Sequence, residues 1–447
     1  MVEKIFGTDG IRGIVNQFPL TKDIIAKLAM SLPECIPYKE PLKVLIGKDT
    51  RDSGNQIEQI LTGFLPESAL VHSMGTAPTP AVSTILQKSQ YNVGIMITAS
   101  HNPAKYNGIK LFLKNGEKLP AHLELQLEKS ILNQANPDNF VPAKPKHVDA
   151  MNIYKKHVCQ ELPVFKGDNR KIAIDCANGS ASIFAPQIFT RLGLNVIAIG
   201  QNPDGRNINA GCGCTNPVNI IQATYDQDAE LGISYDGDAD RAIFCDSCKN
   251  LYDGDDVLYI LANYMKSIGK LRQNTVVVTE QSNSGLEKSL KERNIKVKRV
   301  KTGDKNVALE MKISGVTLGG EPCGHIIFGN QNHCGDGIAT SLYLISVMQQ
   351  TGKTMQELTK GLQKYPYSTE NIKVKQKIPL EQLTNFQHKL AKAQNSLGHE
   401  GRILPRYSGT ENCLRLLIES PNEKFNEYVK KELKKSYLKE VEEKCAA

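Results

Sequence analysis

The sequence predicts an α/β protein with three similar domains, each built on a mixed, mainly parallel sheet, and a smaller C-terminal α+β domain. Three stretches carry this prediction: VLIGKDTRDSG from Val44, KIAIDCANGSAS from Lys171 and VVVTEQSNSGLE from Val276. In each, a β-branched run is followed by a polar pair and then by a Gly- and Ser-rich turn that opens a helical stretch. Strands that alternate with helices need crossover connections, which favour parallel pairing.

The chain has 447 residues, a length typical of several domains. Proline and polar residues cluster at 133–147 and 364–371, which indicates boundaries there. The remaining boundary is expected near Asp246, ahead of a helix that begins around Asp253. A terminal helix is expected because Val429, Leu433 and Tyr437 recur every four residues. The predicted domains are therefore residues 1–147, 148–247, 248–365 and 366–447.

The composition, with 40% hydrophobic and 23% charged residues, is typical of a folded globular protein. No stretch is apolar enough to serve as a signal peptide or to span a bilayer, so we expect a cytoplasmic location. The net charge of +8 suits anionic small molecules as well as nucleic acid. The basic stretch 288–305 lacks aromatic residues that could stack on bases, so we expect a solvated helix and strand, with Lys305 turned toward a phosphate.

Eleven cysteines are present, and without a secretory signal we expect them to be reduced thiols. Cys212, Cys214, Cys245 and Cys248 could together offer four thiolates to zinc. The first pair lacks the usual two-residue spacer, however, and the second lacks the glycines that usually follow. The pattern favours incidental cysteines and leaves a metal or redox role for these four open.

The stretch GIMITASHNP, residues 94–103, places Ser100 directly after an apolar strand and before Pro103. In open α/β sheets, ligands bind at the carboxyl ends of strands. No G-x-S-x-G sequence surrounds Ser100, so the hydrolase arrangement does not apply. Two interpretations stay open: the turn only reverses the chain, or it presents Ser100 as a carrier of a phosphoryl group.

Three aspartates, Asp236, Asp238 and Asp240, alternate in LGISYDGDADR after another apolar strand. Carboxylates so close repel one another, and a hard divalent cation such as Mg²⁺ removes the repulsion. The stretch is no EF-hand, because Arg241 and Ser247 stand where that loop needs Gly and Glu. A solvated acidic turn is the alternative.

Two further stretches are rich in polar groups suited to a sugar phosphate. RYSGTENCLR offers Arg406, the Ser408-Gly409-Thr410 turn and Arg415, which could hold a phosphate without any Walker sequence. GGEPCGHIIFG is expected to be extended, which would place Glu321, Cys323 and His325 on one face. These three could bind sugar hydroxyls, and a purely structural loop is the alternative.

Five motifs, FGTDGIRG, TASHNP with NGIK, DGDADR, GEPCGH and RYSGTEN, occur in the order found in the α-D-phosphohexomutase family, which the chain resembles from end to end. The resemblance implies a heart-shaped enzyme whose four domains each lend a loop to a central cleft. The opening motif, the PDGRNINAGCG stretch and the length are most like bacterial members that interconvert glucosamine 6-phosphate and glucosamine 1-phosphate, which feed UDP-N-acetylglucosamine and cell-wall precursor synthesis. Members acting on mannose and glucose phosphates are the alternative.

The resemblance also implies roles for individual residues. Phosphorylated Ser100 would exchange its phosphoryl group with the sugar through a hexosamine 1,6-bisphosphate. One Mg²⁺ per subunit would be held by Ser100, Asp236, Asp238 and Asp240, with Arg241 adding positive charge. Lys110 would be the general base, which requires a depressed pKa, and His101 and Arg12 would support it. The substrate-binding residues would be Glu321, Cys323, His325, Lys305, Arg406, Ser408, Gly409, Thr410 and Arg415.

Some features depart from the family pattern or allow another class. Cys323 stands where serine is usual and Pro322 where glutamine or methionine is common. Because a thiol is a weaker donor than a hydroxyl, the preferred hexose stays open. Asn412 replaces a common proline.

Two other functions stay open for this sequence: a haloacid-dehalogenase-like phosphatase and a non-enzymatic sugar-phosphate-binding relative. The expected partner is a small sugar phosphate, not nucleic acid or a membrane, bound by a monomer or homodimer.

Overall fold

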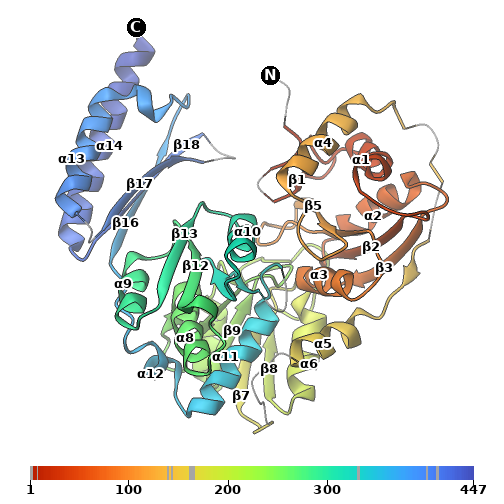
Figure 1. Ribbon diagram of the computed structural model, residues 1–447, viewed down its shortest axis with the longest axis horizontal. Helices are drawn as coiled ribbons and strands as arrows, with labels where there is room; N and C mark the ends of the chain where they lie inside the picture. The colour runs from red at the N-terminus through yellow and green to blue at the C-terminus, as the bar shows by residue number, and fades with distance from the viewer. Residues whose placement is uncertain are drawn as a thin grey trace. The chain divides into compact units, whose positions relative to one another are not determined.

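The computed structural model describes residues 4–7, 9–137, 140–141, 144–160, 167–329, 333–398, 401–408 and 412–446 (Figure 1). The chain forms two compact units. The first comprises Met1–Gln281 and Ile295–Lys360, and the second comprises Ser282–Asn294 and Gly361–Ala447. Three of the four sheets belong to the first unit. No helix in the described part of the chain is long and apolar enough to cross a membrane.

The first sheet has six strands in the order β1-β5-β4-β2-β3-β6. Strands β2, β3, β4 and β6 are parallel, whereas β5 runs antiparallel to β1 and β4. All five residues of β4 are buried, because helices cover both faces of the sheet. Its strands are β1 (Ile11–Ile14), β2 (Lys43–Lys48), β3 (Leu70–Thr76), β4 (Val93–Ile97), β5 (Tyr106–Leu113) and β6 (Lys146–His147). Its helices are α1 (Lys22–Cys35), α2 (Ser53–Phe64), α3 (Thr79–Gln87) and α4 (Ala121–Asn133).

The second sheet has the order β11-β10-β9-β7-β8, with β7 parallel to β8 and β9 and an antiparallel β9-β10-β11 edge. Its strands are β7 (Lys171–Asp175), β8 (Asn195–Ile199), β9 (Leu231–Tyr235), β10 (Ala242–Cys245) and β11 (Leu251–Tyr252). The helices of this region are α5 (Ala150–Gln160), α6 (Ala181–Arg191) and α7 (Val218–Asp226).

The third sheet has the order β13-β12-β14-β15, and only the β14-β15 pair is antiparallel. Its strands are β12 (Thr275–Thr279), β13 (Lys296–Val300), β14 (Leu318–Gly320) and β15 (Ile326–Phe328). The neighbouring helices are α8 (Gly254–Ser267), η1 (Arg272–Asn274), α10 (Asp304–Ser314), α11 (Gly337–Thr351) and α12 (Met355–Thr359). The helix expected near Asp253 is confirmed, and Asp253 caps it by accepting from two backbone N–H groups of its first turn.

The second unit holds an antiparallel sheet in the order β16-β18-β17. Figure 1 shows α13 and α14 along this sheet, and their apolar residues form its core with Leu414 and Ile418. The predicted terminal helix is confirmed, since Val429, Leu433 and Tyr437 are all buried. The elements are α9 (Ser284–Glu292), β16 (Tyr367–Lys373), η2 (Leu380–Gln382), α13 (Thr384–Leu397), β17 (Arg402–Tyr407), β18 (Cys413–Glu419) and α14 (Glu423–Ala446).

The three stretches that predicted the fold class all form strand, turn and helix: β2 with α2, β7 with α6, and β12 with α9. The predicted class, three α/β domains with mixed sheets and a different C-terminal domain, is confirmed. The basic stretch 288–305 forms the end of α9, the half-exposed strand β13 and the start of α10, as expected for solvated elements.

Candidate active site

Ser100 lies in the turn that follows β4, where a buried strand ends in polar residues. Its backbone is in the left-handed region, with φ +52°, and its N–H donates to Thr98 Oγ1 at 2.9 Å. The Ser100 hydroxyl is buried and donates to Asp236 Oδ2 at 2.7 Å. The turn therefore aims the hydroxyl at a carboxylate of the second sheet instead of satisfying it locally.

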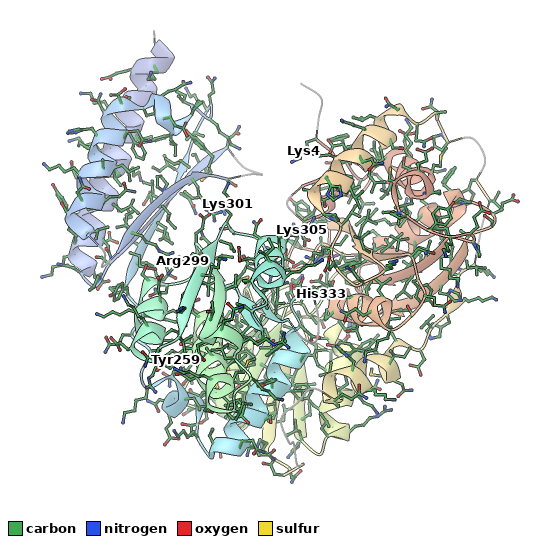
Figure 2. All side chains as sticks on the ribbon, viewed as in Figure 1. Lys4, Tyr259, Arg299, Lys301, Lys305 and His333 are labelled. Atoms are coloured by element: carbon green, nitrogen blue, oxygen red, sulfur yellow. The ribbon has the colours of Figure 1, made fainter. Side chains whose placement is uncertain are left out.

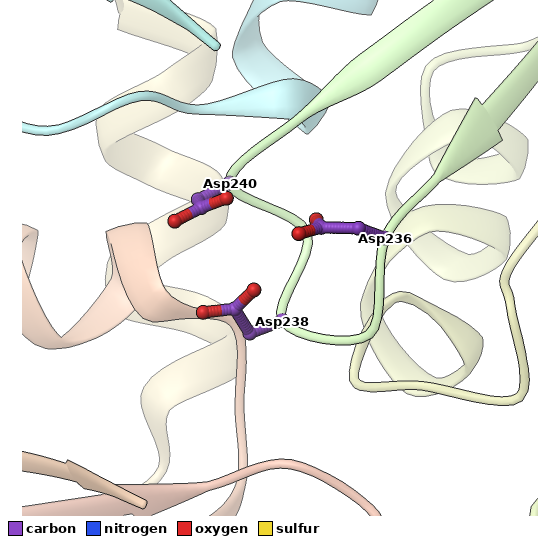
Figure 3. A group of neighbouring side chains, drawn as sticks. All are labelled: Asp236, Asp238 and Asp240. Atoms are coloured by element: carbon purple, nitrogen blue, oxygen red, sulfur yellow. The ribbon is translucent and has the colours of Figure 1, made fainter. Parts of the chain in front are cut away.

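The three aspartates occupy the turn between β9 and β10, and their carboxylates converge (Figure 3). One ligand oxygen from each lies within 4.8 Å of the others, and all three residues are buried. Burial, together with Asp240 and Asp238, raises the pKa of Asp236 well above its usual value. Burial also acts to raise the pKa of Asp240, but Lys110 and His325 outweigh it and hold that pKa well below its usual value.

The same carboxylates carry oxygens that accept no hydrogen bond in the described structure. These are Asp238 Oδ1 and Asp240 Oδ1, both fully buried. A buried carboxylate oxygen without a donor is costly, and a hard cation with oxygen ligands relieves both this cost and the mutual repulsion. The donor set, carboxylates alone with a hydroxyl beside them, fits Mg²⁺ and excludes the solvated acidic turn as an account of these residues.

Close approach of the two turns depends on Gly237. A Cβ atom at this position would lie 2.7 Å from the carbonyl oxygen of Ser100 and 2.7 Å from Ile208 Cδ1. Such distances are far below van der Waals contact, so any larger residue would push the aspartate turn away from the serine turn. On the other side, Thr79 at the start of α3 donates to Asp238 Oδ2 at 2.5 Å.

Lys110, on β5, is buried among carboxylates. Its Nζ lies 2.8 Å from Asp238 Oδ2, 3.2 Å from Asp240 Oδ2 and 3.2 Å from Asp9 Oδ2. Burial acts to lower the pKa of Lys110, but Asp238, Asp240 and Asp9 outweigh it and raise that pKa well above its ordinary value. The depressed pKa expected from the sequence is therefore wrong, because three carboxylates surround the ammonium group.

His101 and Arg241 complete the surroundings of Ser100. His101 Nδ1 lies 3.3 Å from Ser100 Oγ and 3.2 Å from Arg241 Nη1. A guanidinium only donates, so Nδ1 must be the unprotonated ring nitrogen that accepts. Burial, Arg241 and Arg12 lower the pKa of His101 to about 4. Arg12 lies on β1, half-exposed, with its Nη2 3.8 Å from Asp9 Oδ2.

The sugar-loop residues lie in the turn between β14 and β15. The prediction that they form an extended stretch with one shared face is wrong. The N–H of Glu321 donates to the carbonyl of His325 at 3.0 Å, and Gly324, with φ +88°, takes the left-handed backbone that a tight turn requires. A Cβ on Gly324 would meet the carbonyl oxygen of Ala242 at 2.1 Å, so the turn packs against the start of β10.

Each predicted sugar-loop residue already has a protein partner. Glu321 accepts from the N–H of Gly303 at 3.1 Å and from Cys323 Sγ at 4.0 Å. His325 Nε2 accepts from the N–H of Gly335 at 2.8 Å. Burial acts to lower the pKa of His325, but nearby carboxylates, Asp240 foremost, raise it.

Three charged residues at the site were missed by sequence reasoning: Asp9, Lys118 and Asp304. Lys118 Nζ is ion-paired with Asp9 Oδ1 at 2.6 Å and with Asp304. Asp304 Oδ2 also lies 3.4 Å from His325 Nε2. Asp9 could have been noticed, since it belongs to FGTDGIRG. Nothing local distinguishes Lys118 from other lysines.

Lys305, predicted to face a phosphate, lies on α10 (Figure 2). It is ion-paired with Glu124 of α4. Its neighbour Asp304, at the first position of α10, is the residue that points into the charged cluster. The role of Lys305 toward a phosphate stays a prediction, and the structure shows the neighbouring acidic residue in contact with the cluster.

Arg406 and Arg415 lie in the second unit, on β17 and β18. They are direct cross-strand partners, so both side chains emerge on the same face of the sheet. Ser408 follows β17, and its carbonyl accepts from Lys377 Nζ at 2.7 Å. Gly409 and Thr410 lie outside the described residues. Two arginines placed directly opposite repel one another, and a bound anion would remove that repulsion.

The four cysteines weighed as a zinc site do not gather. Among the described residues, the only group of three or more potential metal ligands is the aspartate turn. Cys245 is buried beside Thr224 Oγ1, and Cys248 is exposed. The incidental role that the sequence favoured agrees with these positions.

Comparison with protein-family models finds four matches in chain order. Models of phosphoglucomutase/phosphomannomutase alpha/beta/alpha domains I, II and III match residues 3–138, 147–249 and 253–365. The model of the C-terminal domain matches residues 370–436. The chain belongs to the phosphoglucomutase/phosphomannomutase family, the α-D-phosphohexomutases.

Individual proteins of this family are similar to the chain over nearly its whole length. Phosphoglucosamine mutase of Carboxydothermus hydrogenoformans is 39% identical over 96% of this chain and 98% of its own length. Among solved structures, a family protein of Burkholderia thailandensis has a TM-score of 0.80 at 20% identity, covering 98% of this chain and 97% of its own. N-acetylphosphoglucosamine mutase of Aspergillus fumigatus, in complex with GlcNAc-6P and magnesium, has a TM-score of 0.65 at 18% identity, covering 98% and 96%. At these identities, the structural matches establish the shared fold.

Proposed function

We propose that this chain interconverts glucosamine 6-phosphate and glucosamine 1-phosphate. Relatives named phosphoglucosamine mutase, 39% identical over nearly the whole chain, support this proposal. The observation that carries the proposal is the contact between Ser100 Oγ and Asp236, 2.7 Å apart at a buried group of three carboxylates. A serine hydroxyl beside an oxygen-ligand cation site suits phosphoryl transfer.

In the proposed reaction, Ser100 carries a phosphoryl group. A free hydroxyl of the sugar phosphate attacks the phosphorus, the bond to Ser100 Oγ breaks, and a hexosamine 1,6-bisphosphate forms. After this intermediate turns around, Ser100 Oγ takes the other phosphoryl group and the isomerised sugar phosphate is released. A magnesium ion held by Ser100, Asp236, Asp238 and Asp240 would supply positive charge that stabilises transfer.

The proton of the attacking hydroxyl needs an acceptor, and Lys110 is the candidate base. Its amine is protonated, because Asp238, Asp240 and Asp9 surround it and raise its pKa. Lys110 can lose its proton only when something other than its own charge balances these carboxylates. His101, neutral at pH 7 and 3.3 Å from Ser100 Oγ, supports proton transfer at the serine.

The substrate contacts are proposed on the same basis. Arg406, Ser408, Gly409, Thr410 and Arg415 would hold the distal phosphate, and the cross-strand placement of the two arginines supports this. Glu321, Cys323 and His325 would contact sugar hydroxyls, with Lys305 nearby. We place the domain boundaries at 147/148, 247/248 and 365/366, and the enzyme in the cytoplasm as a monomer or homodimer.

The proposal is tested by a coupled assay for glucosamine 1-phosphate, with Mg²⁺ and a catalytic amount of hexose 1,6-bisphosphate. Ser100→Ala should lower turnover by at least about a thousandfold, because the covalent route is lost. The matched control is Ser31→Ala on α1, which removes another buried hydroxyl and should leave turnover unchanged. Full activity of Ser100→Ala, or a rate unaffected by chelation of divalent metal, would refute the mutase proposal.

Two companion measurements separate this proposal from its alternatives. Phosphopeptide mapping should find an acid-stable phosphate on Ser100, whereas phosphate on Asp236 would indicate the dehalogenase-like chemistry. Comparing the rates with glucosamine, glucose and mannose phosphates decides the preferred sugar. A higher rate with glucose or mannose phosphate would assign the chain to that branch of the family.

A further inference from the structure

Arg51, in the turn after β2, has a fully buried guanidinium that holds the serine turn from behind. Its Nε donates to Asp49 Oδ2 at 2.9 Å. Its other donors reach four backbone carbonyls, three in the serine turn and one at the first residue of β5: Pro103 at 2.6 Å, Ser100 at 3.0 Å, Asn102 at 2.8 Å and, in β5, Tyr106 at 2.9 Å. An arginine has five N–H donors, so every one of them is used.

Asn209 holds the same turn from the second sheet's side. Its Nδ2 donates to the carbonyls of Ser100 at 2.9 Å and Asn102 at 3.1 Å. Its own backbone is fixed by an N–H bond to the Ala177 carbonyl at 2.9 Å. The Ser100 carbonyl thus accepts one donor from each of two sheets, which ties the serine turn to the region that carries the aspartates.

Ser100 needs this support because a serine with φ +52° is in a sparsely populated conformation. Such a conformation persists only where the surroundings over-determine it. The turn lies between β4 and β5, so no ladder of strand hydrogen bonds holds it. Phosphoryl transfer depends mainly on positioning and electrostatics, so a shift of the Ser100 backbone should reach the reaction directly.

We propose that Arg51 and Asn209 are positioning residues that clamp the serine turn and fix Ser100 Oγ relative to the aspartate turn. Their effect on turnover rests on the proposed function, in which Ser100 carries the phosphoryl group. Neither side chain contacts the substrate in this proposal. The clamp therefore affects the rate of phosphoryl transfer and leaves the affinity for the sugar phosphate unchanged.

Asn209→Gly is the deciding variant. Asn209 has φ +58°, which glycine adopts readily, so the substitution removes the amide while keeping the backbone. Asn169→Gly is the matched control, since Asn169 is an exposed asparagine with φ +56° in the loop before β7. We expect kcat of Asn209→Gly to fall about tenfold or more while KM changes less than about twofold. Asn169→Gly should match the wild type.

Amide hydrogen exchange of residues 98–106 measures the clamp without reference to activity. Exchange should rise in Asn209→Gly and stay unchanged in Asn169→Gly. Unchanged kcat and exchange in Asn209→Gly would overturn the clamp, and a raised KM with unchanged kcat would overturn it by making Asn209 a substrate contact. If the wild type had no mutase activity but exchange still rose, the clamp would stand and the proposed function would fail.

Arg51 is tested by chemical rescue. Arg51→Ala removes the guanidinium donors from Asp49 and from four carbonyls, so the variant is first checked for folding by circular dichroism. If it folds, millimolar guanidinium should restore part of kcat, and Arg51→Lys should restore little because an ammonium cannot reproduce the planar fork. Full activity of folded Arg51→Ala without guanidinium would overturn the role of Arg51.

Discussion

The imidazole of His101 shows how much the surroundings change a single residue. Partly buried between Ser100 and two arginines, it is neutral at physiological pH, with its pKa lowered to about 4 from an ordinary value of 6.5. A neutral ring can accept a proton beside Ser100, which a protonated one could not do. This arrangement lowers the stability of the folded protein at acid pH, because His101 binds a proton more readily in the unfolded chain than in the folded protein.

This linkage predicts how stability changes with pH. The folded-state pKa of His101 lies below its unfolded value, so its contribution is fully present above about pH 6.5 and is lost as the pH falls toward 4. In the presence of chelator, wild type should lose about 1–2 kcal/mol more than His101→Asn between pH 8 and pH 5. Urea denaturation at both pH values measures the difference. His122→Asn, an exposed histidine on α4, should behave as wild type. Equal losses in His101→Asn and wild type would contradict the assignment.

Among the structural elements, the turns after β4 and β9 act as a pair. Gly237 is the point where they touch, since a Cβ there would lie 2.7 Å from the Ser100 carbonyl and 3.0 Å from Asn209 Nδ2. The same carbonyl is the centre of the clamp. The absence of a side chain at Gly237 is therefore what allows the Ser100 hydroxyl and the Asp236 carboxylate to lie within hydrogen-bond distance.

Gly237→Ala should accordingly separate the two turns. We expect it to lower kcat about tenfold or more and stability by about 1–3 kcal/mol, because the contacted backbone cannot give way without moving the turn. Gly54→Ala is the control: its Cβ would only touch the Lys48 side chain at 3.4 Å, and alanine favours the helix α2 in which it lies. Steady-state kinetics and thermal unfolding of both variants decide the matter. Wild-type kinetics in Gly237→Ala would contradict the close approach.

Across the first unit, the charges of Asp9, Lys118 and Asp304 connect the first sheet with the helix α10 of the third. Lys118 is 6% exposed, and it pairs with both carboxylates. Asp304 in turn lies beside His325. Lys110 and the turn between β14 and β15 thus share one buried network, which holds together segments nearly two hundred residues apart (186 between Lys118 and Asp304).

Removing the ammonium group of Lys118 tests how much this network contributes to the stability of the fold. Lys118→Ala takes the shared cation away from Asp9 and Asp304 in a buried site, so we expect the free energy of unfolding to fall by about 3–5 kcal/mol. Lys312→Ala breaks a pair with Glu117 that joins the same two regions, but at a lysine whose side chain is 58% exposed. We expect it to cost less than about 1 kcal/mol. Thermal unfolding compares the two, and similar small losses would show that the Lys118 network is not a structural link.

How much of the fold and the site could be predicted depends on how far apart in the sequence the interacting residues lie. The fold class and the serine and aspartate turns could be predicted because each has a local pattern, an apolar strand followed at once by polar residues. Arg406 and Arg415 could be named because both lie in one ten-residue stretch. The prediction of an extended sugar loop also failed for a local reason. Gly324 permits a tight turn, and the alternation of polar residues does not distinguish such a turn from an extended stretch. Arg51 belonged to a recognised repeat, but the carbonyls that it binds are about fifty residues away.

By itself, the sequence determined which chemical groups the protein presents and on which turns, because each strand, turn or helix pattern depends on only a few neighbouring residues. Only the tertiary structure decided what those groups do to one another. Lys110 and Asp238 are 128 positions apart, yet their contact is part of what holds the lysine charged. Burial and Coulomb energy are sums over all neighbours in space, and those neighbours exist only once the sheets have packed together.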